Sequence, residues 1–178
     1  MPKIAPFGLW VGMKTSEIEA PLEEIAPFKY KTTTLPKPHS AFEFYILQIT
    51  PKSGLSWVKA LGKNVPTNGY GFELQSVFSE MEGKLSRSYG RNTRTDALLP
   101  GSIWNEPRDW MQALLKRERI LVSAWDEKSG ATLPEGLTSI YLGVSAVDTE
   151  SGFISLEYTL ENNGESEAEI AAAEDDAL

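Results

Sequence analysis

The sequence predicts an α+β fold: an antiparallel sheet of about six strands in two three-stranded meanders, with two to three helices packed on one face. Three observations lead to this class. Helical and strand periodicities occupy separate stretches of the chain. The predicted strands follow one another through short turns instead of alternating with helices, which favours antiparallel pairing. The chain has 178 residues, of which 41% are hydrophobic, and this is enough for a packed core.

The first predicted element is a short or kinked helix over about residues 16–26. Ser16 and Glu19 have the spacing of a capping box, and Pro21 limits the helix because a proline past the first turn removes a hydrogen bond. Three strands follow, rich in aromatic and β-branched residues and separated by Pro- and Gly-containing turns: 28–33, 42–49 and 55–63.

The next element has the clearest helical pattern in the chain. The helix is expected to begin at Phe72 and to end at Gly90, a residue type that commonly follows a helix. Residues 91–102 are predicted to be a connector. The apolar residues that form the helical stripe are Leu74, Val77, Phe78, Met81 and Leu85.

A second helix is expected over 105–117, followed almost directly by a strand over 119–126. Asn105 is a suitable N-cap, and Pro107 falls in the first turn, where its missing N–H has no cost. After Arg119 the apolar pattern changes from helical to two-fold, which is typical of a strand.

The last two predicted strands, 137–147 and 153–160, are joined by a hairpin turn over 148–152. Residues 161–178 contain seven acids and lose apolar periodicity, so they are expected to form an acidic, flexible or loosely helical tail. Residues 1–160 are predicted to be a single α+β domain. The order of elements also suggests pseudo-repeat halves, 1–64 and 65–160.

Charge is distributed unevenly along the chain. The formal net charge is −8, and all eleven acids after Lys128 lie in a stretch that contains no basic residue. Contacts to phosphate require clustered Lys and Arg, so direct nucleic-acid binding is not expected. The distribution instead favours a protein partner with a basic surface.

Composition also bears on the location of the protein. There is no run of about 18 apolar residues, so no membrane span is expected. No secretory signal is recognised at the start of this sequence, and there is no cysteine that could form a disulfide. A cytoplasmic protein is expected, although a processed periplasmic protein would have the same composition.

No catalytic or cofactor-binding motif is recognised. His39 is the one histidine, and the adjacent Ser40 is poorly placed to face it in a catalytic triad. Gly69, Tyr70 and Gly71 precede a helix but lack the lysine and the third glycine of a phosphate-binding loop. No metal-ligand spacing is present, so no metal and no cofactor are predicted.

One basic cluster offers an alternative function. Arg87, Arg91 and Arg94 are close in sequence and can form an anion-binding pocket. The simpler interpretation is that these arginines pair with nearby acids such as Glu82 and Asp96.

The absence of reactive groups favours a non-catalytic binding protein, for example a bacterial inhibitor or immunity protein that blocks a basic toxin or nuclease. The alternatives are an enzyme that uses carboxylate acid/base chemistry or an arginine-lined anion pocket, and a structural accessory subunit whose oligomeric state is open. Trp104 can either pack back onto its helix or act as an interface anchor. The acidic tail can serve solubility or mimic nucleic-acid charge. The residues predicted to bind the partner are Trp104, Tyr141, Glu157, Glu174, Asp175 and Asp176.

Overall fold

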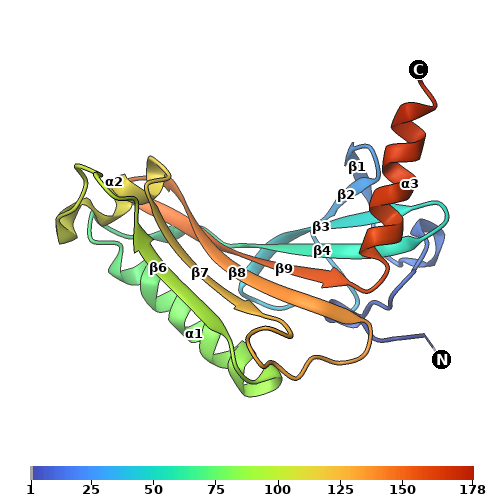
Figure 1. Ribbon diagram of the computed structural model, residues 1–178, viewed down its shortest axis with the longest axis horizontal. Helices are drawn as coiled ribbons and strands as arrows, with labels where there is room; N and C mark the ends of the chain where they lie inside the picture. The colour runs from blue at the N-terminus through green and yellow to red at the C-terminus, as the bar shows by residue number, and fades with distance from the viewer. Residues whose placement is uncertain (1) are drawn as a thin grey trace. The chain divides into compact units, whose positions relative to one another are not determined.

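The computed structural model describes residues 2–178 and confirms the α+β class (Figure 1). The sheet contains nine strands in the order β1-β2-β3-β4-β9-β8-β7-β6, and β5 pairs with β9. The pairings of β1 with β2, β2 with β3, β5 with β9 and β6 with β7 are antiparallel. The prediction of about six strands in two meanders was therefore too low.

The chain divides into two compact units, which are described separately. The first contains the residues up to Ala60 together with Leu133–Ile140 and Glu157–Leu178. The second contains Leu61–Thr132 and Tyr141–Leu156. The last two strands, β8 and β9, contribute residues to both units. The halves 1–64 and 65–160 stay a prediction.

The first unit holds four strands, the starts or ends of the long hairpin strands, two short 3₁₀ turns and one helix. Its core includes Tyr45, Leu47 and Leu55, which are almost completely buried. Its elements are the turns Pro6–Gly8 and Thr15–Glu17, β1 (Glu23–Ala26), β2 (Lys29–Thr32), β3 (Phe42–Thr50), most of β4 (Gly54–Gly62), parts of β8 (Leu137–Asp148) and β9 (Ser151–Leu160), and α3 (Asn163–Asp175).

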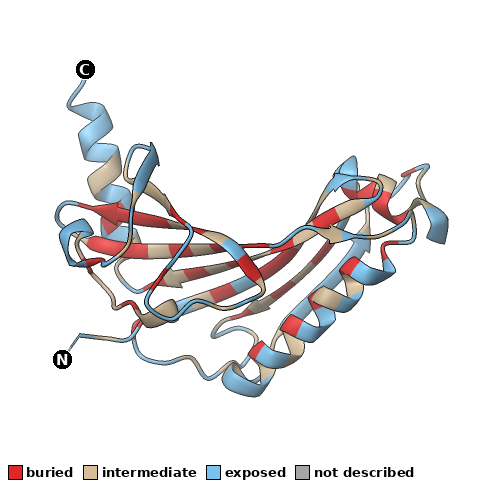
Figure 2. Ribbon diagram, turned by 180° about the vertical axis from the view of Figure 1, so that it is seen from behind, coloured by how far each residue is buried: buried red, intermediate tan, exposed pale blue. Residues whose placement is uncertain are grey.

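The second unit holds two helices and the remaining strands. Helix α1 (Phe72–Tyr89) has a buried stripe that faces the sheet, and its other side is exposed (Figure 2). Gly90 ends the helix as predicted, with a positive φ of 87° and an N–H bond to the carbonyl of Ser86. The other elements are β5 (Val65–Pro66), β6 (Thr93–Leu98), the 3₁₀ turn Pro107–Asp109, α2 (Trp110–Leu115) and β7 (Arg119–Trp125).

The predicted helix over 16–26 was wrong. Only a 3₁₀ turn forms there, and residues 23–26 form the edge strand β1. The side chain of Glu17, not of Glu19, accepts the hydrogen bond that starts the turn, from the N–H of Lys14 at 2.9 Å. All four residues of β1 are exposed, so the strand has no two-fold burial pattern to reveal it.

The connector predicted over 91–102 contains strand β6. Its residues are exposed or half-buried, because the strand lies at the edge of the sheet and is polar on both sides. The predicted second helix begins later than expected: Pro107 starts a 3₁₀ turn, and Asn105 caps neither segment. The direct passage from helix to strand is confirmed, with Arg117 at a φ of 60° between α2 and β7.

Candidate functional site

His39, the one histidine, belongs to a local turn. The ring nitrogen Nδ1 of His39 accepts the N–H of Ala41 at 3.1 Å, so this nitrogen serves the local turn. Across residues 2–178 there is no group of three or more His, Asp or Glu side chains that is able to hold a metal ion. In the same part of the chain, no helix has the length and apolar character that a membrane crossing requires.

One face of the sheet in the second unit is covered by α1. Leu74 packs so closely on the backbone of β9 that a Cβ atom at Gly152 would lie 2.6 Å from its Cδ2. On β7, Leu121 and Trp125 are at most 1% exposed on this side, and the Ser123 hydroxyl donates to the Glu82 carboxylate of α1. This side of the sheet is therefore an ordinary helix–sheet core.

Helix α1 leaves the opposite face of the same strands uncovered, and Leu114 and Leu115 of α2 line part of it. Strand residues alternate between the two faces, so the neighbours of the buried β7 residues point to this open side. Several large apolar side chains there are strongly exposed: Ile120 is 47%, Tyr141 41% and Val147 56% exposed. We call this surface the open face; its residues are Thr93, Thr95, Ala97, Ile120, Val122, Ala124, Tyr141, Gly143, Ser145, Val147, Phe153 and Ser155.

None of the residues named for the open face is charged, and a groove of about 460 Å³ hollows the face. A Cβ atom placed on Gly143 would lie 3.4 Å from the ring of Tyr141 and 3.5 Å from the side chain of Val122. Gly143 therefore leaves space in the floor of the groove. Arg117 and Arg119 line one end of it. Tyr141, predicted from the sequence as a partner-binding residue, thus lies in a surface built from four strands.

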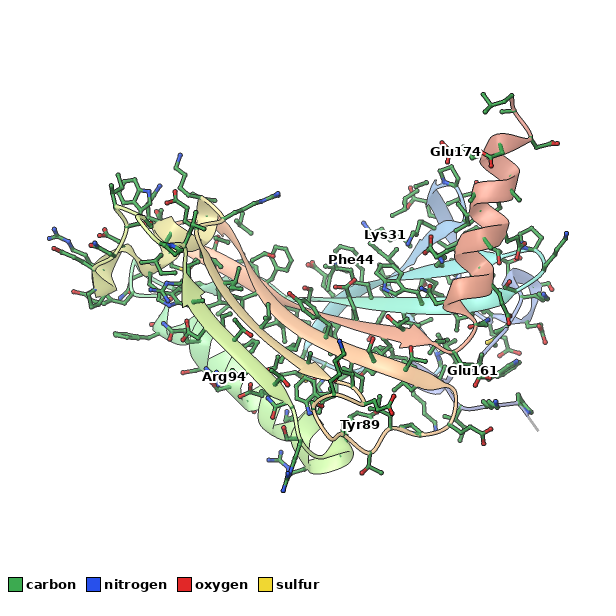
Figure 3. All side chains as sticks on the ribbon, viewed as in Figure 1. Lys31, Phe44, Tyr89, Arg94, Glu161 and Glu174 are labelled. Carbon is green, nitrogen blue, oxygen red and sulfur yellow. The ribbon has the colours of Figure 1, made fainter. Side chains whose placement is uncertain are left out.

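Of the predicted arginine cluster, Arg94 is already paired. Its Nη1 donates to Glu82 Oε1 at 2.7 Å, and its guanidinium lies 5.3 Å from the centre of the Phe78 ring, at the β6–α1 contact seen in Figure 3. Arg87 lies in the last turn of α1 and is exposed, and Arg91 is exposed beyond Gly90. The geometry thus favours the simpler interpretation for Arg94, while the anion-pocket alternative for the other two stays a prediction.

Replacing Arg94 with Met is expected to lower the free energy of unfolding by about 1–2 kcal/mol, because Glu82 is only 14% exposed and would lose its charged partner. Arg87→Met is the matched control and should change stability by less than about 0.5 kcal/mol. Urea unfolding of both variants measures the difference. Equal effects would show that the Arg94–Glu82 pair does not stabilise the fold.

Trp104 lies in the loop before α2 and is half-buried. Its backbone N–H donates to the Ser102 hydroxyl at 3.2 Å, which fixes the loop locally. The neighbouring Ile103 is 75% exposed. The two interpretations of Trp104, as a packing residue and as an interface anchor, both stay open.

In the first unit, the acidic C-terminal stretch forms helix α3 where a flexible or loosely helical tail was expected. The helix is attached to the β3–β4 turn through Glu169. Its Oε1 accepts hydrogen bonds from the Thr50 hydroxyl, the Ser53 N–H and the Ser53 hydroxyl at 2.8–2.9 Å, and Oε2 accepts the Lys52 N–H at 2.8 Å. One carboxylate thus satisfies four donors of a single turn.

A second set of polar contacts lies beneath the first turns of α3. Gln48, Ser56 and Ser166 are at most 1% exposed. The amide of Gln48 donates to the Ser56 hydroxyl at 3.2 Å and to the Ser166 hydroxyl at 3.1 Å, and Ser56 donates to Ser166 at 2.9 Å. Buried polar groups are stable only when they are bonded in this way, so the network specifies where the helix sits.

The pKa of Glu169 gives a pH-dependent prediction. Desolvation raises this pKa, but the four hydrogen bonds outweigh it and lower the pKa to about 2. Since the pKa is depressed in the folded state, the stabilisation is complete above the ordinary value of 4.5 and is lost as pH falls from about 4.5 towards 2. Denaturation at a series of pH values should therefore show a larger loss of stability over this range for the wild type than for Glu169→Gln. The same dependence of stability on pH in the wild type and in Glu169→Gln would contradict this prediction.

The remaining predicted partner-binding residues lie in the first unit. Glu157 is half-buried on β9, and its charge acts on Lys29, whose pKa is lowered mainly by burial and partly restored by Glu167 and Glu157. Lys29 Nζ lies over the Trp57 ring at 4.0 Å. Glu174, labelled in Figure 3, is exposed near the end of α3, as are Asp175 and Asp176.

No protein-family model, curated protein or solved structure matches this chain.

Proposed function

We propose that this protein is a non-catalytic binding module of the inhibitor or immunity type, which blocks a protein partner with a basic surface. The observation that supports the proposal is the open face of the second unit. A large contiguous patch of exposed apolar surface is rare on a soluble protein and marks an interaction site. The groove along Tyr141 supplies the concave centre in which a partner's side chains can be desolvated.

The preference for a basic partner is supported by α3. Glu174, Asp175 and Asp176 sit at the C-terminal end of the helix, where the helix dipole is negative and acids are unfavourable. No basic residue follows Lys128 to compensate for them. Residues that act against local stability are expected at functional positions, and a basic partner surface would reverse their effect.

Affinity capture from cells of the source organism tests the proposal. The immobilised wild-type protein is expected to retain one partner stoichiometrically at low salt and to lose most of it at about 0.5 M salt, where charges more than roughly 5 Å apart are screened. The triple variant Glu174→Lys, Asp175→Lys, Asp176→Lys should retain at least about tenfold less. Lysines suit a helix C-terminus, so this variant keeps its helix. Salt-independent capture, or equal capture by the variant, would contradict the role of charge.

A further inference from the structure

The β3–β4 turn has the donor arrangement of an oxyanion site. The backbone N–H groups of Lys52 and Ser53 and the hydroxyls of Thr50 and Ser53 all reach one carboxylate within 2.9 Å. Successive backbone N–H groups in a turn form a concavity that binds anions, and hydroxyls strengthen it. The ligand here is the chain's own Glu169, which comes from a helix more than a hundred residues away in sequence.

The charge around this turn also suits an anion. The ammonium group of Lys14 donates to the carbonyls of Pro51 and Lys52, at 3.0 and 2.6 Å, which places a positive charge on the back of the turn. Two acids of α3, Glu165 and Asp176, border the neighbouring groove and are the opposing charges.

The helix that supplies Glu169 is held in a way that allows it to leave. Its described contacts with the sheet include hydrogen bonds of Asn163, Ser166 and Glu167 to Gln48, of Ser166 to Ser56, and of Glu169 to the Thr50–Ser53 turn. The preceding Asn162 donates to the carbonyls of Ser53 and Leu55, and Ser166 is the one buried residue of the helix. A carboxylate and hydroxyls that separate in water regain hydrogen bonds to solvent, so the net cost of separation is small compared with that of an apolar seam.

A groove leads to the turn from solvent. It has a volume of about 580 Å³, and Phe28, Pro51, Lys52 and Ser53 line it on one side. Ala168, Ala172 and Ala173 of α3 line the other side, and the carboxylate of Glu169 borders the same space. A small anion can thus reach the edge of the site while α3 is still in place.

We propose that the Thr50–Ser53 turn is a binding site for a small oxyanion, a carboxylate or a phosphate, and that Glu169 is its internal occupant. Helix α3 is then a displaceable element, attached to the sheet by a side chain that imitates the ligand. In the wild type the tethered Glu169 has a high effective concentration at the turn, which keeps a free anion out at moderate concentrations.

The Glu169→Ala variant tests this by emptying the turn. Inorganic phosphate or acetate is added to the full-length variant and to the wild type, with chloride at equal ionic strength as the reference. The Tm of the variant is expected to rise saturably, by about 3–6 °C at a concentration tenfold above Kd, while that of the wild type does not respond. Separate titrations with phosphate and acetate distinguish a phosphate ligand from a carboxylate ligand.

Amide chemical shifts give a second readout that does not depend on stability. In ¹⁵N–¹H spectra of the variant, the N–H signals of Lys52 and Ser53 should move with added phosphate or acetate. Glu165→Ala, which removes an exposed acid from the same groove, is the control and should behave like the wild type. If Glu169→Ala is poorly folded, Glu169→Ser, whose side chain is too short to reach the turn, serves in its place. Equal responses of variant and wild type, or shifts that do not include Lys52 and Ser53, would overturn the proposal. No protein partner takes part in these experiments, so failure of the anion-site proposal is distinct from failure of the proposed function.

Discussion

Replacing Val122 with Glu is expected to weaken binding of the captured partner by at least about 100-fold. Val122 lies in the middle of the open face, between Ile120 and Ala124 on β7 and across from Thr95 on β6. The longer charged side chain would fill the groove beside Gly143 and would have to be desolvated when apolar side chains of the partner enter it, at a cost of roughly 3 kcal/mol or more. Titration calorimetry with the purified partner measures the change in Kd.

The matched control is Leu99→Glu. Leu99 is in the second unit, 57% exposed, and lies beyond β6 and outside the open face, so the same change of chemistry is made away from the proposed interface. Both variants should keep the Tm of the wild type within a few degrees, because neither position is in the core. If Val122→Glu binds as tightly as Leu99→Glu, the open face is not where the partner binds.

Replacing Gly54 with Ala is expected to destabilise the protein by more than about 4 kcal/mol. Gly54 has a φ of 70°, and a Cβ atom there would lie 2.1 Å from the carbonyl oxygen of Gly12. The backbone of Gly12 cannot move away from the added methyl group as a flexible side chain could. Around this contact, the Gly12 N–H donates to the Leu55 carbonyl and the Leu55 N–H to the Met13 carbonyl, so the clash would also separate these bonds.

Gly101→Ala separates the steric effect from the conformational one. Gly101 also has a positive φ, of 85°, but a Cβ atom there would meet nothing within 4 Å. It should therefore cost only the strain of the left-handed conformation, roughly 1–2 kcal/mol. Thermal unfolding of both variants provides the comparison. Similar losses would show that the close approach of Gly12 does not exclude a side chain at position 54.

Elements with buried faces could be predicted from the sequence, and elements without them could not. The stripe through Leu74, Phe78, Met81 and Leu85 located α1 to the residue, because these side chains are all buried on one side. Strands β1 and β6 lie at the ends of the sheet order, where few residues are buried. Periodicity reports burial, so edge strands leave little trace in it.

The open face was partly visible in the sequence, and the Thr50–Ser53 site that Glu169 occupies was not. Alternation over Ile120–Trp125 indicated a two-sided strand, and Tyr141 was selected from an adjacent strand. Sequence alone could not show that α1 covers only one of the two sides. Glu169 and Thr50 are separated by 119 positions, and neither residue type is unusual in its local context. Only the fold brings the donors and the acceptor together.

The most direct test of the account is photo-crosslinking from the open face. A benzophenone amino acid replaces Ile120 in one sample and Leu99 in another, and both are irradiated in cells that contain the partner. The account predicts one discrete adduct from position 120 that is absent from position 99. No adduct from position 120, or the same adducts from both positions, would contradict a binding function for this surface.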